Sequence, residues 1–218
     1  MPISSAISTS PIGDELIEEV VVLPGGDVRV LRPGDPEALL TEEAFKREDL
    51  LPYWAELWAS SLALARTLAV RPLRGARLLE LGCGLGLAAI AAARAGARVT
   101  ATDWSAPAVR LTARNAEANG VDLETQRCSW QRPAPLAARA PWPLVTASDV
   151  LYDRANIPLL LDLLPKLTDG GSEVLIADPG RPPAEEFLDR AAERWQVSSE
   201  PAPGSPQVLL NRLGRRSP

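Results

Sequence analysis

Histidine is absent from this 218-residue sequence. Its absence excludes Ser-His-Asp and Cys-His nucleophilic chemistry, and it excludes metal sites built on imidazole ligands. Cysteine is almost as scarce, because Cys83 and Cys128 are the only two and lie far apart without metal-ligand spacing. The sequence therefore predicts no disulfide scaffold and no metal site, and it favours a reducing, cytoplasmic location. Catalysis, if present, must depend on carboxylates, tyrosine, lysine or the proximity of reactants.

Long apolar runs and an excess of positive charge are missing as well. No run approaches the roughly 20 apolar residues of a membrane span. Residues 1–10 are rich in serine and lack the basic start and apolar centre of a signal peptide. The formal net charge of −5 argues against a general nucleic-acid binder, which usually carries a basic face. We expect neither a membrane nor a nucleic acid as a partner; a monomer is favoured, although the sequence does not identify the oligomeric state.

The apolar content of 46% is that of a globular chain, long enough for one domain with an N-terminal elaboration. Residues 1–51 are expected to form a flexible lead, a hairpin within 16–31 and a charged helical segment at 41–50. The hairpin prediction rests on two β-branched runs that flank Pro24-Gly25-Gly26-Asp27. Residues 52–218 are expected to form the main domain.

Strand and helix patterns alternate through this main domain. Strands are expected at 77–81, 98–103, 123–128, 144–149, 173–178, 194–199 and 207–213, and helices at 52–69, 86–94, 105–118, 157–167 and 184–193. Residues 130–143, with four prolines, are expected to form a loop. The alternation predicts an α/β fold with a doubly wound, mostly parallel seven-stranded sheet, in which the last two strands pair antiparallel.

One stretch joins an apolar strand to a helix through a glycine-rich turn, Glu80-Leu-Gly82-Cys83-Gly84-Leu-Gly86. Strand, tight turn and helix in this order present backbone groups to a nucleotide-like ligand. A dinucleotide turn has the pattern G-x-G-x-x-G, and here Leu87 stands at its last glycine position. Asp103 follows about 20 residues later, where either a dinucleotide or another nucleoside ligand needs an acceptor for its ribose hydroxyls.

Acids and aromatic residues gather at the predicted carboxyl ends of the strands, where ligands bind in doubly wound sheets. These ends carry Glu80 with the glycine turn, Asp103-Trp104, Cys128-Ser129-Trp130, Ser148-Asp149 and Asp178-Pro179-Gly180. A sheet built only for packing does not require this pattern. The sequence thus predicts a ligand site at this edge.

The acid-x-Gly-x-Gly turn, with Asp103 at the next strand end, resembles the class I S-adenosylmethionine-dependent methyltransferases. The segments Pro52–Trp58, Ser129-Trp130, Ser148–Tyr152 and Asp178–Pro182 are similar to the seven-β-strand protein-lysine methyltransferases, a group that includes the electron transfer flavoprotein β-subunit lysine methyltransferase. The resemblance implies a Rossmann-like fold and S-adenosylmethionine as cofactor. It assigns cofactor contacts to Trp58, Glu80, Gly82, Cys83, Gly84, Gly86, Asp103, Trp104, Trp130 and Ser148, and the acceptor side to Asp149 and Tyr152.

The resemblance implies transfer of a methyl group to an amine acceptor, and a protein lysine is favoured. Asp149 would hold the ammonium, and an aromatic face of Tyr152 or Trp54 would stabilise its charge; whether Asp149 also acts as base stays open. A small-molecule N-methyltransferase, a non-catalytic S-adenosylmethionine-binding protein and an NAD-dependent oxidoreductase are the alternatives. The sequence does not identify the acceptor or the degree of methylation.

Overall fold

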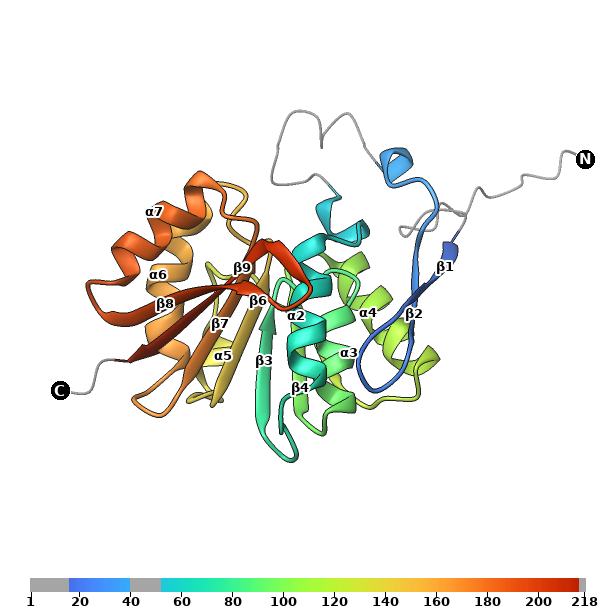
Figure 1. Ribbon diagram of the computed structural model, residues 1–218, viewed down its shortest axis with the longest axis horizontal. Coiled ribbons are helices and arrows are strands. Elements are labelled where there is room, and N and C mark those ends of the chain that lie inside the picture. Colours follow the sequence, from blue (N-terminus) through green and yellow to red (C-terminus); the bar gives the residue numbers. More distant parts are fainter. Residues whose placement is uncertain (1–15, 40–51, 216–218) are drawn as a thin grey trace, which may run out of the picture.

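A seven-stranded sheet forms the centre of the protein, in a computed structural model that describes residues 16–39 and 52–215 (Figure 1). Its strand order is β5-β4-β3-β6-β7-β9-β8. The strands are β3 (Arg77–Leu81), β4 (Arg98–Asp103), β5 (Glu124–Arg127), β6 (Leu144–Ser148), β7 (Glu173–Asp178), β8 (Trp195–Ala202) and β9 (Ser205–Arg215). The first five are parallel, and β9 pairs antiparallel with both β7 and β8. The predicted fold class is confirmed, including the antiparallel pair.

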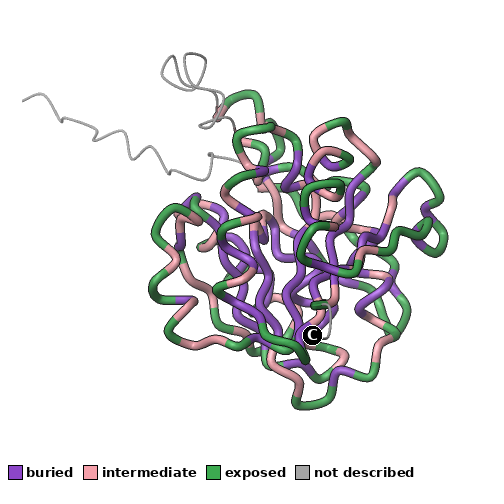
Figure 2. The backbone as a smooth tube through the Cα atoms, turned by 90° about the vertical axis from the view of Figure 1, so that its left-hand side faces the viewer, coloured by how far each residue is buried: buried purple, intermediate pink, exposed green. Residues whose placement is uncertain are grey.

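Helices cover both faces of this sheet. On one face lie α2 (Ala59–Ala69), α3 (Leu87–Arg94) and α4 (Ala106–Ala118), and on the other lie α5 (Ala134–Ala137), α6 (Asn156–Leu167) and α7 (Pro182–Ala191). Successive strand residues point to opposite faces, so the neighbours Leu78 and Leu79 belong to two separate apolar clusters. Figure 2 shows the buried backbone of the sheet between the more exposed outer segments.

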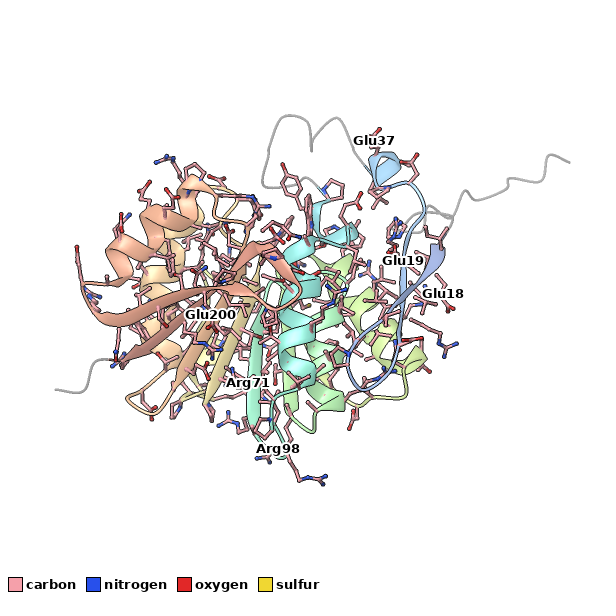
Figure 3. All side chains as sticks on the ribbon, viewed as in Figure 1. Glu18, Glu19, Glu37, Arg71, Arg98 and Glu200 are labelled. Carbon is pink, nitrogen blue, oxygen red and sulfur yellow. The ribbon has the colours of Figure 1, made fainter. Side chains whose placement is uncertain are left out.

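The predicted two-stranded hairpin is present, and it packs against α3 and α4. It consists of β1 (Leu16–Val21) and β2 (Val28–Pro33), paired antiparallel, and a short 3-10 helix, η1 (Glu37–Leu39), follows it. Val28 and Val30 are fully buried in the cluster that contains α3, whereas Glu18 and Glu19 of β1 lie at the outer side of the molecule (Figure 3). The predicted lead at 1–13 and the charged segment at 41–50 lie outside the described residues.

Two expected elements differ from the structure. The helix expected over 52–69 is divided into a 3-10 turn, η3 (Tyr53–Ala55), and α2, with extended residues between them. Trp58 has an extended backbone, and its indole Nε1 donates a hydrogen bond to the Tyr53 carbonyl at 2.8 Å. This bond links η3 to the residue before α2 and stabilises the interruption between them. The loop expected at 130–143 contains the short helix α5. Pro133 precedes its first residue and Pro135 lies in its first turn, where a missing N–H is tolerated.

The break before α2 lies at the carboxyl end of the parallel strands. Arg98, the first residue of β4, lies at the lower end of the sheet in Figure 3, so the carboxyl ends lie at the top, near η3. The helical turn and the strand ends therefore meet at one edge. None of the helices in the described ranges has the length and apolarity needed to cross a membrane.

Candidate active site

A cleft opens at the carboxyl ends of β3, β4 and β6, with an empty volume of about 740 Å³ including the space open to solvent. We call it the first cleft. Ten of the twelve residues singled out from the sequence line it: Trp58, Gly82, Cys83, Gly84, Asp103, Trp104, Trp130, Ser148, Asp149 and Tyr152. Tyr53, Trp54, Glu56 and Ser61 also line it, so the aromatic residues of the 52–58 segment contribute to the cleft.

The glycine turn packs tightly against two neighbouring segments. A Cβ on Gly84 would lie 3.3 Å from the backbone oxygen of Trp54, which closes the cleft on that side. Gly86 has φ +81°, and a Cβ there would lie 2.6 Å from Thr112 Cγ2 on α4. Thr112 also donates a hydrogen bond from Oγ1 to the Gly84 carbonyl at 2.9 Å. Gly86 is thus needed for packing of the turn on α4, and it does not line the cleft.

Asp103 ends β4 with its carboxylate under the turn. Its Oδ2 accepts a hydrogen bond from the Gly84 N–H at 3.1 Å, and its Oδ1 accepts one from the Ser105 N–H at 2.8 Å. Burial raises the pKa of Asp103 to about 6, although these backbone N–H groups oppose the rise. A carboxylate has about four lone-pair positions. Asp103 therefore keeps acceptor capacity toward the cleft that it lines.

Glu80 lies behind the turn and does not line the first cleft. It is almost completely buried, and burial raises its pKa to about 8, with a hydrogen bond from the Ala89 N–H opposing the rise and the charge of Asp103 adding to it. Its Oε2 has no hydrogen-bond partner among the described residues. The local role of Glu80 is to hold the start of α3 from beneath.

Asp149, directly after β6, has an unusual backbone conformation. Its φ is +54°, a left-handed value that no other non-glycine residue shows in the described ranges. Such strain persists where surrounding structure enforces it, and it is frequent at functional sites. The side chain is only 9% exposed; Oδ1 lies 2.7 Å from Arg181 Nη1, whereas Oδ2 is buried with no partner in the described part of the chain.

A second cleft adjoins the first through a shared wall. Tyr53, Trp58, Asp149 and Tyr152 line both clefts, and Asp153, Arg154, Arg181 and Pro183 line only the second of the two. The ring of Tyr53 lies 5.0 Å from that of Tyr152 and 6.3 Å from that of Trp58. The residues shared by the two clefts are thus three aromatic side chains, which we call the aromatic wall, and one acid, Asp149. Aromatic faces and a carboxylate both attract cations, so this boundary suits a small cationic group that reaches from the second cleft into the first.

Sequence reasoning placed Asp178 to Arg181 near this edge but assigned no contact to Arg181. The pairing of Arg181 with Asp149 joins residues from different strand ends, and no spacing in the sequence indicates it. Thr112 was missed too, because a threonine inside a helix pattern gives no sign that it faces the glycine turn.

Comparisons with known proteins agree with this geometry. A family profile described as lysine methyltransferase matches residues 53–194. An electron transfer flavoprotein β-subunit lysine methyltransferase of Xenopus laevis is 38% identical over 137 residues, which cover 60% of this chain and 53% of that protein. The protein N-lysine methyltransferase METTL21A of Danio rerio is 30% identical over 151 residues, which cover 66% of this chain and 69% of that protein.

Solved structures give the same fold. A ribosomal protein L11 methylase from Lactobacillus delbrueckii subsp. bulgaricus has a TM-score of 0.52 at 25% identity, covering 72% of this chain and 79% of that one. A 16S rRNA N2 G1207 methyltransferase of T. thermophilus, solved with AdoMet and guanosine, has a TM-score of 0.64 at 16% identity. The match covers 92% of this chain and 51% of that one. The chain spans about half the length of the electron transfer flavoprotein methyltransferases that it matches. On the match over residues 53–194, the chain belongs to the lysine methyltransferase family.

Proposed function

We propose that this protein transfers a methyl group from S-adenosylmethionine, held in the first cleft, to the amine of a protein lysine that enters through the second. The observation that carries the proposal is the position of Asp149. It lines both clefts, and its buried Oδ2 has no partner in the described part of the chain. A buried carboxylate oxygen without a partner is costly, and an entering ammonium group would satisfy it.

The charges of the first cleft fit this cofactor. Its described lining includes the acids Glu56, Asp103 and Asp149 and neither lysine nor arginine. S-adenosylmethionine carries a sulfonium and an ammonium, which an acidic cleft attracts, whereas a dinucleotide brings a pyrophosphate that it would repel. Asp103 would accept hydrogen bonds from the ribose hydroxyls, and Trp104 and Trp130 offer apolar faces near them. The same charges disfavour the NAD alternative.

The remaining cofactor contacts are part of this proposal. Trp58, Gly82, Cys83, Gly84 and Ser148 would touch the cofactor directly. Glu80 and Gly86 would act through the turn, since neither lines the cleft.

S-adenosylmethionine supplies an activated methyl group, and transfer forms one N–C bond while the S–C bond breaks and its electron pair stays on sulfur. The residues of this chain bind and align the acceptor. The acceptor ammonium must first lose a proton to water or to Asp149, because only the neutral amine has a lone pair for the methyl group. Tyr152, in contact with Tyr53, would then stabilise the charge of the methylated product.

The names of the relatives suggest which acceptor to test first. Two relatives matched at 38% identity over more than 130 residues methylate, by their names, the β-subunit of electron transfer flavoprotein. We infer a lysine of that subunit, or of another protein, as the acceptor. We also infer that residues 52–218 form the catalytic unit and that the protein works in the cytoplasm as a monomer; its two cysteines, both buried and unpaired, support a reducing compartment.

The test is transfer of labelled methyl from S-adenosylmethionine to purified electron transfer flavoprotein β-subunit and to a cell extract, followed by mapping of methyl-lysine. We expect labelled lysine with the unaltered protein, a fall of about 100-fold or more with Asp149→Asn, and a fall of about tenfold with Tyr152→Leu, which removes the aromatic face. Asp162→Asn, which removes an exposed acid of α6 that lines neither cleft, should leave the rate unchanged. Label found only in small molecules would contradict a protein acceptor, and an active Asp149→Asn variant would contradict the role of Asp149.

A further inference from the structure

A short turn after β7 fixes the direction of the Arg181 side chain. Asp178, completely buried at the end of β7, accepts hydrogen bonds on Oδ1 from the N–H groups of Gly180 at 2.8 Å and Arg181 at 2.9 Å. Its Oδ2 lies 3.2 Å from Arg181 Nη1. The same Nη1 lies 2.7 Å from Asp149 Oδ1. The guanidinium is therefore held between two acids from neighbouring strand ends.

This contact gives the two oxygens of the Asp149 carboxylate different environments. Oδ1 is paired with the Arg181 guanidinium, whereas Oδ2 is buried and has no partner in the described residues. An acceptor ammonium that bound Oδ2 would thus lie next to a fixed positive charge. Two cations sharing one carboxylate repel each other, and a like charge within about 4–6 Å favours loss of a proton.

Methyl transfer needs the amine without its proton. A lone carboxylate would bind the acceptor but would also keep it as an ammonium, since an opposite charge stabilises the protonated form. A carboxylate neutralised by a fixed guanidinium still accepts a hydrogen bond, yet it holds the proton on the amine less strongly.

We propose that Arg181 is a positioning residue that occupies Oδ1 of Asp149, leaves Oδ2 to orient the acceptor amine, and assists release of the amine proton to water. The inference rests on the proposed methyl transfer to an amine. It gives a role to a segment whose charge neither the fold nor the family match explains.

Other charged and titratable groups also face this junction. They are Tyr53 and Glu56 before α2, Asp103 at the end of β4, Tyr152, Asp153 and Arg154 after β6, and Asp178 at the end of β7. Arg154 is the other cation of the second cleft, but its guanidinium is paired with Glu186 of α7 and largely exposed. Among the described residues, Arg181 is thus the cation in contact with Asp149.

The first measurement is the pH dependence of methyl transfer by the unaltered protein, Arg181→Gln and Arg181→Lys. Arg181→Gln should shift the rising limb of the kcat–pH profile upward by about one pH unit, because the bound acceptor amine then keeps its proton to a higher pH. At pH 7.5 kcat should fall about tenfold while KM stays equal or falls, and activity should recover near pH 9. Arg181→Lys should restore most of the profile. Equal loss at every pH would show a merely structural role and overturn the inference.

The control variant is Arg190→Gln, which removes the same charge from α7 at a site outside both clefts, and it should leave the profile unchanged. Circular dichroism of each variant shows whether it folds. If Arg181→Gln does not fold, Arg181→Met, another uncharged variant of similar length, takes its place in the pH series, and an unshifted rising limb in that folded variant would overturn the inference.

A second measurement needs no acceptor protein. n-Butylammonium, an analogue of the lysine side chain, is titrated into the protein with and without S-adenosylhomocysteine, and tryptophan fluorescence reports binding. Arg181→Gln should bind n-butylammonium at least about threefold more tightly than the unaltered protein, and addition of Asp149→Asn should abolish the gain. Without such a gain the inference is wrong. If the gain appears but the unaltered protein methylates no acceptor, the proposed function fails while the role of Arg181 at Asp149 stands.

Discussion

The carboxamide of Asn115 on α4 is paired in both directions with the backbone of Leu31 on β2. The Leu31 N–H donates to Asn115 Oδ1 at 2.8 Å, and Asn115 Nδ2 donates to the Leu31 carbonyl at 3.1 Å. One helical turn later, Asn119 repeats the pattern with Arg29, at 3.0 Å and 2.6 Å. Four residues of helix span about 6 Å and two residues of strand about 6.7 Å, so the two amides match alternate residues of β2. The helix thereby satisfies the free edge of the hairpin.

Asn115 also connects the hairpin to the glycine turn, because Nδ2 donates to the Leu85 carbonyl at 2.9 Å. Replacement of this fully buried residue in Asn115→Leu would leave one N–H and two carbonyls without a partner. We expect a loss of about 2–4 kcal/mol in the free energy of unfolding and weaker binding of S-adenosylhomocysteine. Urea unfolding and calorimetric titration measure the two effects. Asn119→Ala, at a partly exposed position where water replaces the amide, should cost less than about 1.5 kcal/mol; equal costs would contradict the assignment.

Gly86→Ala should destabilise the turn through a specific clash with Thr112. Two atoms of Thr112 lie 2.6 Å and 3.0 Å from the position of the added Cβ. We expect a loss of about 2–4 kcal/mol, of which about 1–2 kcal/mol comes from the positive φ and the rest from overpacking. Gly75→Ala has a similar φ of +75° and open space around it, so only the first part should appear.

Removal of the clashing atoms isolates the second part. In the Thr112→Ala background these two atoms are absent and only the Cβ of residue 112, 3.1 Å from the added Cβ, stays close, so Gly86→Ala should cost clearly less than in the unaltered protein and only slightly more than Gly75→Ala. Urea unfolding of the unaltered protein, Gly86→Ala, Thr112→Ala and the double variant gives the coupling free energy between the two positions. If the costs of the two single substitutions simply add in the double variant, the clash does not determine the cost of Gly86→Ala.

The sequence predicted the sheet well because its central strands are short apolar runs that end in acids, and their carboxyl ends must meet at one edge. The division of the helix at 52–69 was not predictable, since it depends on the bond of the Trp58 indole to Tyr53. Burial of Trp142 within a proline-rich loop was equally hidden, because Arg77 and Arg139 lie over its ring at 4.5 Å and 5.0 Å from different segments.

The residues that line the first cleft differ in how visible they are in the sequence. Acids at strand ends were found because their position along the chain fixes their edge of the sheet. The cofactor contact of Glu80 stays a prediction, and its place behind the turn was not foreseeable, because parallel strands are buried on both faces and their sequence does not show which way a side chain points. The Asp149–Arg181 contact joins two strand ends far apart in the sequence, and neither this contact nor the positive φ of Asp149 is revealed by a pattern of residue types.

Glu80 should make the stability of the protein depend on pH. Burial raises its pKa from an ordinary 4.5 to about 8 in the folded protein. Between these values the unfolded chain has lost the proton that the folded protein keeps, so the free energy of unfolding falls as pH rises. Glu80→Gln does not titrate and should remove this part of the decline. Urea unfolding from pH 5 to 8.5 checks it, with Glu117→Gln, an exposed acid of α4, as the control; parallel curves for Glu80→Gln and the unaltered protein would refute the expectation.

Asp103 should make binding of S-adenosylhomocysteine depend on pH in the opposite direction. Burial raises its pKa to about 6, so it is largely protonated at pH 5 and ionised at pH 7.5. The proposed contact with both ribose hydroxyls uses the ionised form, which accepts hydrogen bonds at both oxygens. Affinity should therefore rise through pH 6 and then level off. Asp103→Asn should bind about 10- to 100-fold more weakly at pH 7.5, as expected for loss of hydrogen bonds to a charged group, and should show a flat profile.

Calorimetric titration at half-unit steps of pH measures both effects, and Asp162→Asn, at an exposed acid of α6, should follow the unaltered protein. A rise that persists in Asp103→Asn would assign the titration to another group. A flat profile in the unaltered protein, with tight binding at pH 5, would mean that the ribose does not rely on the ionised carboxylate of Asp103, and the proposed position of the nucleoside in the first cleft would then be wrong.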